Sequence, residues 1–254
     1  MSKFSLLDIF LKNDISFFCG VPDSLLANFS LELEENKKKI SHIITPNEGN
    51  AIGTAIGYNL STDKVPLVYM QNSGLGNAVN PIVSLASKQV WKVPIFLLIG
   101  WRGNNKLKDE PQHLKQGKIT LPFLKLMNID YKIYSEKMVN KQVSNLKAKA
   151  LKDKKVVALV LPAKYTASNF KRIIKNISNN ANKITRIKVI EEVLKYKSDK
   201  DILISTTGKT SRELYLAQKN IGLPHKDLFV VGGMGHASSI AYGIAKSIKN
   251  KRIF

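Results

Sequence analysis

The chain has 254 residues, of which 44% are hydrophobic, and carries a formal net charge of +21. This composition excludes a disordered chain and predicts one large domain, or one complete domain with part of a second. The longest apolar run, residues 93–101, is too short to span a bilayer, and the single cysteine, Cys19, excludes a disulfide framework or a multi-cysteine zinc site.

The positive charge comes mainly from lysines spread over helical stretches, without interleaved aromatic residues or a nucleic-acid-binding motif. We therefore expect no nucleic-acid partner and no membrane partner, but a lysine-rich solvated surface that also attracts small anions. Asp8, Lys12 and Asp14 interrupt the apolar residues near the start, so we predict no secretory signal. A cytoplasmic protein is expected, because a lone cysteine suits a reducing compartment.

Short apolar runs rich in β-branched and aromatic residues alternate with amphipathic stretches along the chain. This alternation predicts an α/β fold with a doubly wound parallel sheet, covered by helices on both faces. The predicted strands lie within residues 15–20, 41–45, 66–72, 93–100, 131–134, 156–161, 202–206 and 227–231.

A polar stretch rich in lysine and asparagine breaks this alternation after the sixth predicted strand. It predicts a first domain over residues 1–172, a connection over 173–185 and a partial second domain over 186–254. Residues 251–254 resemble the entry into another buried strand, so we expect the sequence to end within the second domain's fold.

The stretch TPNEGNAIGTAIGYNL, residues 45–60, predicts a helix with Thr45 as N-cap and Glu48 completing a capping box. Glycines at 49, 53 and 57 each cost such a helix roughly 0.5–1 kcal/mol relative to alanine. Their spacing leaves one face almost without bulk, which favours the close approach of another backbone or of a ligand.

Two glycine-containing turns follow the last two predicted strands. Residues 205–213, STTGKTSRE, are not a P-loop, because Leu203 occupies the position of its first glycine. Residues 231–239, VGGMGHASS, do not match a dinucleotide fingerprint. Each turn can bind a phosphate group at a helix N-terminus or can simply join a strand to a helix.

Two polar segments, residues 71–81 and 100–117, follow other predicted strands and are candidate functional loops. His113 is either a surface histidine or a catalytic one. Arg102 either binds an anion or is simply solvated, and its spacing does not decide between the two.

Several motifs, taken in order, resemble those of the phosphonopyruvate decarboxylases, a thiamine-diphosphate-dependent family with sulfopyruvate decarboxylase as near kin. The resemblance covers nearly the whole chain. It rests on GVPDS, NEGNAIGTAIGY, VYMQNSGLGNAVNP, LLIGWRG, DEPQH, STTGKTSRE and GGMGHASS.

The resemblance implies a pyrimidine-binding first domain and the start of a diphosphate-binding second domain. It implies that Glu48 hydrogen-bonds N1′ of the thiamine diphosphate pyrimidine and that Asp23 serves proton transfer, with helix N-capping as the rival role for Asp23. His113 is a further catalytic candidate. The cofactor-binding positions implied are Gly208, Lys209 and Thr210 at the diphosphate, and Gly232, Gly233, Met234 and Gly235 at the aminopyrimidine. Asn72, Asn77 and Arg102 are candidates for substrate contact.

The implied reaction is decarboxylation of 3-phosphonopyruvate to phosphonoacetaldehyde and CO2 in phosphonate biosynthesis, through the thiamine ylid. Mg2+ is implied as second cofactor, but the Gly-Asp-Gly motif that binds it in the family is missing, so we expect an incomplete form of the enzyme. A homo-oligomer with the active site at a subunit interface, or a complementing chain, is also implied. The alternatives are a sulfopyruvate or other 2-oxo-acid decarboxylase and a noncatalytic dimerising subunit.

Overall fold

The computed structural model describes residues 5–104, 109–165, 184–206, 208–223, 227–233 and 235–254. The chain forms two compact units, Met1–Arg172 and Ile173–Phe254. The predicted connection over residues 173–185 lies almost wholly outside the described residues. None of the described helices combines the length and apolar character needed to cross a bilayer.

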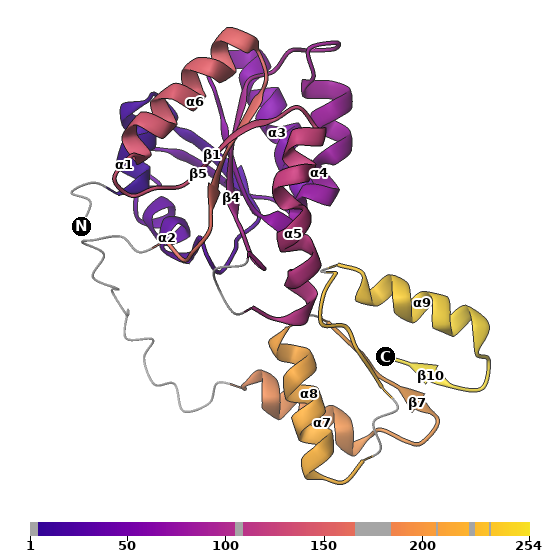
Figure 1. Ribbon diagram of the computed structural model, residues 1–254. Coiled ribbons are helices and arrows are strands. Elements are labelled where there is room, and N and C mark those ends of the chain that lie inside the picture. The colour runs from indigo at the N-terminus through magenta and orange to yellow at the C-terminus, as the bar shows by residue number, and fades with distance from the viewer. Residues whose placement is uncertain (1–4, 105–108, 166–183, 207, 224–226, 234) are drawn as a thin grey trace. The chain divides into compact units, whose positions relative to one another are not determined.

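The first unit is built on a six-stranded sheet in which every neighbouring pair is parallel (Figure 1). This confirms the predicted doubly wound α/β fold. Strands β4 (Ile95–Gly100) and β6 (Val156–Leu161) are continuous apolar runs because helices bury both of their faces. In spatial order the strands are β2 (Ser41–Ile44), β1 (Phe17–Gly20), β3 (Leu67–Gln71), β4 (Ile95–Gly100), β6 (Val156–Leu161) and β5 (Asp130–Ile133).

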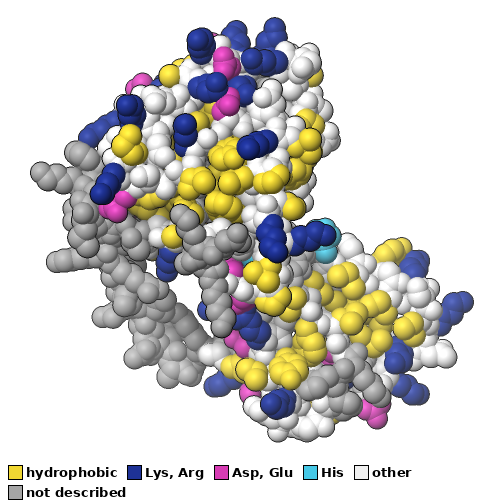
Figure 2. Space-filling model, viewed as in Figure 1, with side chains coloured by type: hydrophobic (Ala, Val, Ile, Leu, Met, Phe, Trp, Pro, Cys, Tyr) yellow, Lys and Arg dark blue, Asp and Glu magenta, His cyan; other side chains and the backbone are white. Residues whose placement is uncertain are grey.

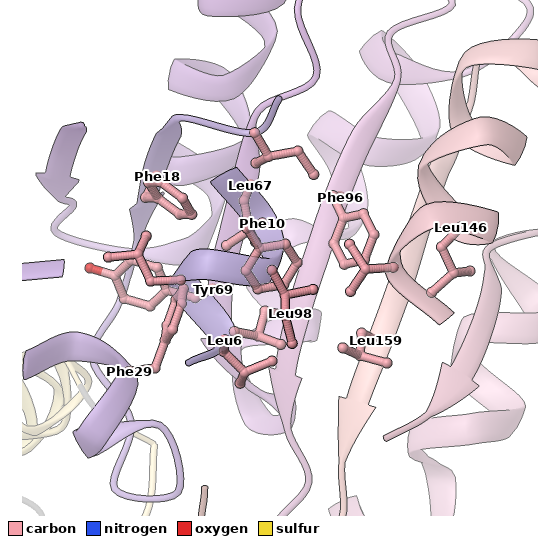
Figure 3. Close-up of a cluster of buried hydrophobic side chains, with 14 of the residues drawn as sticks. Leu6, Phe10, Phe18, Phe29, Leu67, Tyr69, Phe96, Leu98, Leu146 and Leu159 are labelled. Atoms are coloured by element: carbon pink, nitrogen blue, oxygen red, sulfur yellow. The ribbon is translucent and has the colours of Figure 1, made fainter. Parts of the chain in front are cut away.

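Helices cover both faces of this sheet and enclose two apolar clusters. On one face lie α1 (Leu6–Lys12), α2 (Ala27–Glu35) and α6 (Val139–Asp153). Figure 3 shows aromatic side chains gathered in this cluster, where the ring centroids of Phe10 and Phe96 are 5.3 Å apart. The other face carries α3 (Glu48–Thr62), α4 (Leu75–Pro81) and α5 (Pro111–Leu126), with short helical turns η1 (Asn72–Gly74) and η2 (Ile82–Ala86).

In the described part of the second unit, short strands pack with three helices. The strands form two parallel pairs, β10 with β7 and β8 with β9. Strands β7 and β8 follow each other in the chain and are separated only by Leu203. Its elements are α7 (Arg186–Lys195), β7 (Asp201–Ile202), β8 (Ile204–Ser205), α8 (Lys209–Asn220), β9 (Leu228–Phe229), α9 (Ala237–Ser247) and β10 (Arg252–Ile253).

The strand predicted at residues 251–254 is present as β10, but the prediction that it is buried is wrong. Arg252 is exposed and Ile253 is only half-buried. Among the described residues β10 has one neighbouring strand, β7, and the Arg252 guanidinium extends to Asp201 on that strand, with Nε donating to Oδ1 over 2.7 Å.

Figure 2 shows Lys and Arg side chains scattered between hydrophobic ones on the visible surface.

Candidate active site

The N-terminus of α3 places Glu48 in the interior of the first unit. Asn47 is the N-cap, and its side-chain oxygen accepts the Asn50 N–H at 2.9 Å. The predicted Thr45 cap and capping box are therefore wrong: the helix begins later, and the Thr45 hydroxyl donates instead to the Asn47 carbonyl at 3.1 Å. Asparagine and threonine are both good caps, so local preference could not choose between them.

Glu48 is only 5% exposed and is held by two neighbours from the segment that follows β3. Asn77 Nδ2, on α4, donates to Glu48 Oε2 over 2.8 Å. Gly74 packs so closely on the carboxyl group that a Cβ there would collide with Oε1. The sequence analysis did not single out Gly74, because it is one of two glycines in residues 71–81 and no local feature distinguishes it from Gly76.

The three glycines of α3 differ in what they contact. A Cβ on Gly49 would lie 2.9 Å from the Asn77 carbonyl oxygen, so the approach of α4 explains this glycine. Gly53 and Gly57 are exposed, and a Cβ on either would meet no atom of the described chain within 4 Å. The close contact predicted for this helix is therefore found within the chain at Gly49 alone.

Asp23 is buried in the loop after β1, at the edge of the sheet where the parallel strands end. Its Oδ2 accepts the Leu25 N–H at 2.9 Å, and its Oδ1 has no hydrogen-bond partner among the described residues. Burial raises the pKa of Asp23, against the opposing effects of the Leu25 hydrogen bond and the Arg102 charge. Gly100, at the end of β4, leaves room for the carboxyl group, since a Cβ there would collide with Oδ2.

The structure does not support the rival helix-capping role for Asp23. Helix α2 begins at Ala27 with Leu26 as its N-cap, and no side chain caps it. Asp23 thus lies too early in the chain to cap this helix and presents its carboxyl group within the loop.

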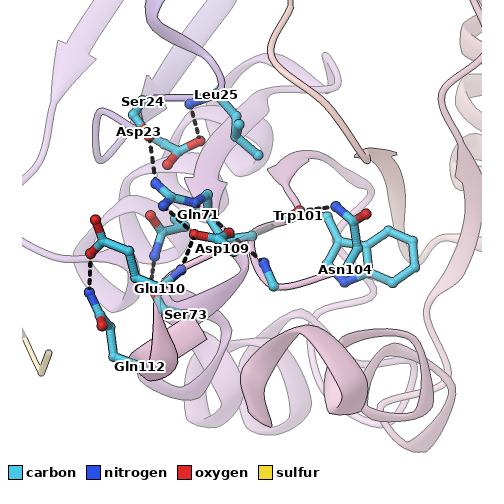
Figure 4. A network of polar contacts seen from close by, with 12 residues as sticks. Asp23, Ser24, Leu25, Gln71, Ser73, Trp101, Asn104, Asp109, Glu110 and Gln112 are labelled. Atoms are coloured by element: carbon cyan, nitrogen blue, oxygen red, sulfur yellow. Dashed lines mark hydrogen bonds and ion pairs between the residues drawn. The ribbon is translucent and has the colours of Figure 1, made fainter. Parts of the chain in front are cut away.

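Arg102 is engaged in a network of polar contacts shown in Figure 4. Its Nε and Nη2 donate to the two oxygens of Asp109 at 2.8 and 2.5 Å, and its Nη1 donates to Ser24 Oγ at 2.9 Å. Asp109 also accepts the Gly103 N–H at 2.7 Å. The Arg102 guanidinium holds the pKa of Asp109 well below its usual range. Arg102 is therefore fixed beside the Asp23 loop rather than simply solvated.

Asn72 has its side-chain amide fully used inside the protein. Its Nδ2 donates to the Arg102 carbonyl at 2.9 Å and to Thr120 Oγ1 at 2.8 Å, while its Oδ1 accepts the Arg102 N–H at 3.1 Å. Both amide hydrogens of Asn72 are thus committed, and the residue ties the ends of β3 and β4 to α5. In this arrangement it has no donor left for a substrate.

His113 lies half-buried in the first turn of α5. Its Nδ1 has no hydrogen-bond partner among the described residues. Burial, reinforced by the nearby Arg102 charge, lowers the pKa of His113. The lowered pKa favours the uncharged form of the imidazole.

The glycine-containing turns of the second unit follow parallel strands β8 and β9, so both turns lie at the same edge of that pair. Gly208, Gly233 and Gly235 have φ values of 68°, 65° and 86°, which glycine adopts without strain. Ser211 Oγ links the two turns by donating to the Thr206 carbonyl at 2.6 Å, and it also lies 3.2 Å from the Val230 carbonyl.

The described residues among the implied cofactor-binding positions lie in these turns or at the start of α8. Gly208 is the N-cap of α8, whose first residues are Lys209 and Thr210, and no described side chain makes a capping hydrogen bond there. Gly232 is half-buried in the other turn, whereas Met234 lies outside the described residues. Within the described part of the chain, no group of three or more His, Cys, Asp or Glu could hold a metal ion.

Residues 4–121 match the family model described as thiamine pyrophosphate enzyme, N-terminal TPP binding domain. The chain is 28% identical over 218 residues to a phosphonopyruvate decarboxylase of Streptomyces viridochromogenes, covering 80% of this chain and 53% of that protein. It is 36% identical over 121 residues to a sulfopyruvate decarboxylase subunit alpha of Methanococcus maripaludis, covering 48% of this chain and 70% of that subunit.

The chain thus spans about half the length of that phosphonopyruvate decarboxylase. Among solved structures, a benzoylformate decarboxylase from Polynucleobacter necessarius resembles the fold, with a TM-score of 0.51 and 18% identity over 81% of this chain and 38% of that one. The curated relatives are similar to this chain in sequence, and the benzoylformate decarboxylase is similar to it in fold. The chain belongs to the thiamine-diphosphate-dependent decarboxylase family that includes the phosphonopyruvate and sulfopyruvate decarboxylases.

Proposed function

We propose that this chain forms part of a thiamine-diphosphate-dependent decarboxylase that converts 3-phosphonopyruvate to phosphonoacetaldehyde and CO2 in phosphonate biosynthesis. The observation that carries the proposal is the buried carboxyl group of Glu48, held between Asn77 and Gly74 at the start of α3. A carboxyl group fixed in this way suits a single, directed hydrogen bond to a heteroaromatic nitrogen.

The residues of both units fit the cofactor. Glu48 would hold the proton at N1′ of the pyrimidine, and the turn at Gly233 would contact the aminopyrimidine through its backbone. The turn at Gly208 would bind the diphosphate through backbone N–H groups and the N-terminus of α8. Lys209 and Thr210 would add a charge and a hydroxyl group there. When bound, thiamine diphosphate supplies the electron sink that decarboxylation of a 2-oxo acid requires.

Asp23 and His113 are proposed to move protons on the substrate side. The unpartnered Oδ1 of Asp23 and its raised pKa suit a carboxyl group that takes part in proton transfer. The uncharged imidazole of His113 suits an acceptor. The fixed guanidinium of Arg102, near both, would attract the anionic end of the substrate.

Mg2+ is proposed from the family resemblance, and we assign it no ligand among the described residues. A second copy or a complementing chain is proposed to cover α3, where Gly53, Gly57 and Leu60 are exposed. The relative named sulfopyruvate decarboxylase subunit alpha supports a multi-subunit enzyme. A cytoplasmic location is part of the same proposal.

Sulfopyruvate is the second candidate substrate, because the Methanococcus maripaludis relative of that name is 36% identical. The test is CO2 release from phosphonopyruvate and sulfopyruvate, side by side, with thiamine diphosphate and Mg2+, for this chain alone and together with a complementing chain. Faster release from phosphonopyruvate is expected. Equal rates would contradict the narrower claim, and no turnover of either substrate, even with a complementing chain, would favour a noncatalytic dimerising subunit.

A further inference from the structure

A buried polar cluster at the N-terminus of α1 is not used by the proposed chemistry. The first N–H groups of a helix have no partner within the helix. Here the Leu6 N–H donates to Tyr165 Oη at 2.8 Å, and the Leu7 N–H donates to Glu32 Oε2 at 3.2 Å. Residues from α2 and from beyond β6 thus complete the start of α1.

Tyr165 and Glu32 are also bonded to each other. The Tyr165 hydroxyl donates to Glu32 Oε1 at 2.8 Å, and the two residues are 6% and 4% exposed. The Tyr165 hydroxyl hydrogen is donated to Glu32, and the Tyr165 hydroxyl oxygen accepts the Leu6 N–H. The Tyr165 ring is therefore fixed at its far end.

The backbone of Tyr165 extends this cluster to the Asp23 loop. Its N–H donates to the Leu25 carbonyl at 2.9 Å, and its carbonyl accepts from Asn28 Nδ2 at 2.9 Å. The Leu25 N–H in turn donates to Asp23 Oδ2 at 2.9 Å. A continuous path of hydrogen bonds and covalent bonds thus joins Glu32, Tyr165, Leu25 and Asp23.

We propose that Tyr165 is a positioning residue for Asp23. The hydrogen bonds that hold the Tyr165 hydroxyl are called the anchor, and Glu32 makes this anchor sensitive to pH. The importance of Asp23 rests on the proposed function, whereas the anchor itself does not. Fixing Tyr165 at its hydroxyl fixes the Leu25 carbonyl, and with it the N–H that orients the Asp23 carboxyl group. Releasing the hydroxyl therefore loosens the Asp23 loop without touching it.

The pH sensitivity follows from burial of Glu32, which raises its pKa to about 7, against the hydrogen bonds from Tyr165 and Leu7. Asp8 on α1 and Glu35 on α2 raise this pKa further. Tyr134 faces the same group, since the Glu32 charge contributes to the raised pKa of that tyrosine. These neighbours supply no compensating positive charge.

Opening the anchor returns Glu32 to water, where the pKa of a glutamate is about 4.3. The closed form therefore binds the proton more tightly, so closure is favoured at low pH and weakens as the pH rises through about 7. Between pH 6 and pH 8 this linkage predicts an increase of about tenfold in the population of the open form.

The test is amide hydrogen exchange at Leu6, Leu7 and Leu25 in the 254-residue chain, with rates corrected for the intrinsic effect of pH. In the wild type, protection should fall about tenfold from pH 6 to pH 8. Glu32→Gln should abolish this pH step. Tyr165→Phe should lower protection at Leu6 and Leu25 at both pH values, whereas Tyr131→Phe, a half-buried tyrosine on β5, should change neither.

Unchanged protection of Leu25 in Tyr165→Phe would overturn the positioning role, and a pH step that persists in Glu32→Gln would overturn the role of Glu32. If Tyr165→Phe does not fold, Glu32→Gln still tests the anchor, because glutamine keeps the shape and an acceptor. None of these readouts needs turnover. Failure of the proposed decarboxylase activity would therefore leave them unchanged.

Discussion

A side chain on Gly74 would collide with the carboxyl group of Glu48, although the two residues lie on different elements. Glu48 begins α3, and Gly74 ends the short turn η1 after β3. The Glu48 carboxyl group can therefore occupy its place only because residue 74 has no side chain. The candidate catalytic carboxyl group is positioned by shape as well as by its hydrogen bond to Asn77.

This relationship predicts that Gly74→Ala displaces Glu48 and destabilises the chain by about 1–3 kcal/mol, the usual cost of overpacking. Chemical denaturation monitored by circular dichroism would measure the loss. Gly76→Ala is the matched control, because a Cβ there meets no described atom within 4 Å and α4 gains helix propensity. Equal effects of the two variants would contradict the contact.

The exposed glycines of α3 should respond in the opposite direction. Gly53→Ala and Gly57→Ala should each stabilise the isolated chain by about 0.5–1 kcal/mol, because alanine is the better helix former and the added methyl group meets open space. Thermal unfolding would measure this gain. If the face binds a second copy, sedimentation should show weaker association in the same variants, whereas Gly49→Ala should destabilise the chain itself.

Glu48→Gln should leave the fold intact, since glutamine still offers an oxygen to Asn77 Nδ2. We expect the free energy of unfolding to change by less than about 1 kcal/mol. In the active protein, CO2 release should fall by at least about 100-fold, because an amide cannot hold the proton at the pyrimidine nitrogen. Unchanged turnover would remove Glu48 from the proposed chemistry.

The Arg102–Asp109 pair predicts a dependence of stability on acid. The pKa of Asp109 is lowered in the folded chain, so its contribution is present above the pKa of the unfolded carboxyl group, about 3.9, and is lost as the pH falls through the lower folded value.

Asp109→Asn should therefore destabilise the chain at pH 7 by about 1–3 kcal/mol. The free energy of unfolding of this variant should also fall less steeply as the pH is lowered into the acid range. Denaturant midpoints measured from pH 2 to pH 7 would show it. Asp153→Asn is a suitable control, because its Lys149 partner is half exposed and such surface pairs contribute little. A loss at pH 7 equal to that of the control would contradict the prediction.

The sequence was sufficient to predict the architecture, because strands buried on both faces consist of continuous apolar residues, as in β4 and β6. The local pattern also singled out the glycine-containing turns, because each follows a predicted strand and precedes a predicted helix, whereas Glu48 and Asp23 became catalytic candidates only through the family resemblance. These features depend on neighbours in the chain, which a sequence pattern records directly.

Only the tertiary structure showed which contacts are made by residues of the same type that lie near each other in the sequence. Asn72 and Asn77 have the same side chain five positions apart, yet one ties Arg102 to α5 and the other holds Glu48. Gly74 contacts a carboxyl group, while Gly76 faces open space. Tyr165 meets Glu32 across 133 residues of chain. Contacts between distant segments depend on how the sheet brings them together, and local preferences in the sequence carry no record of that.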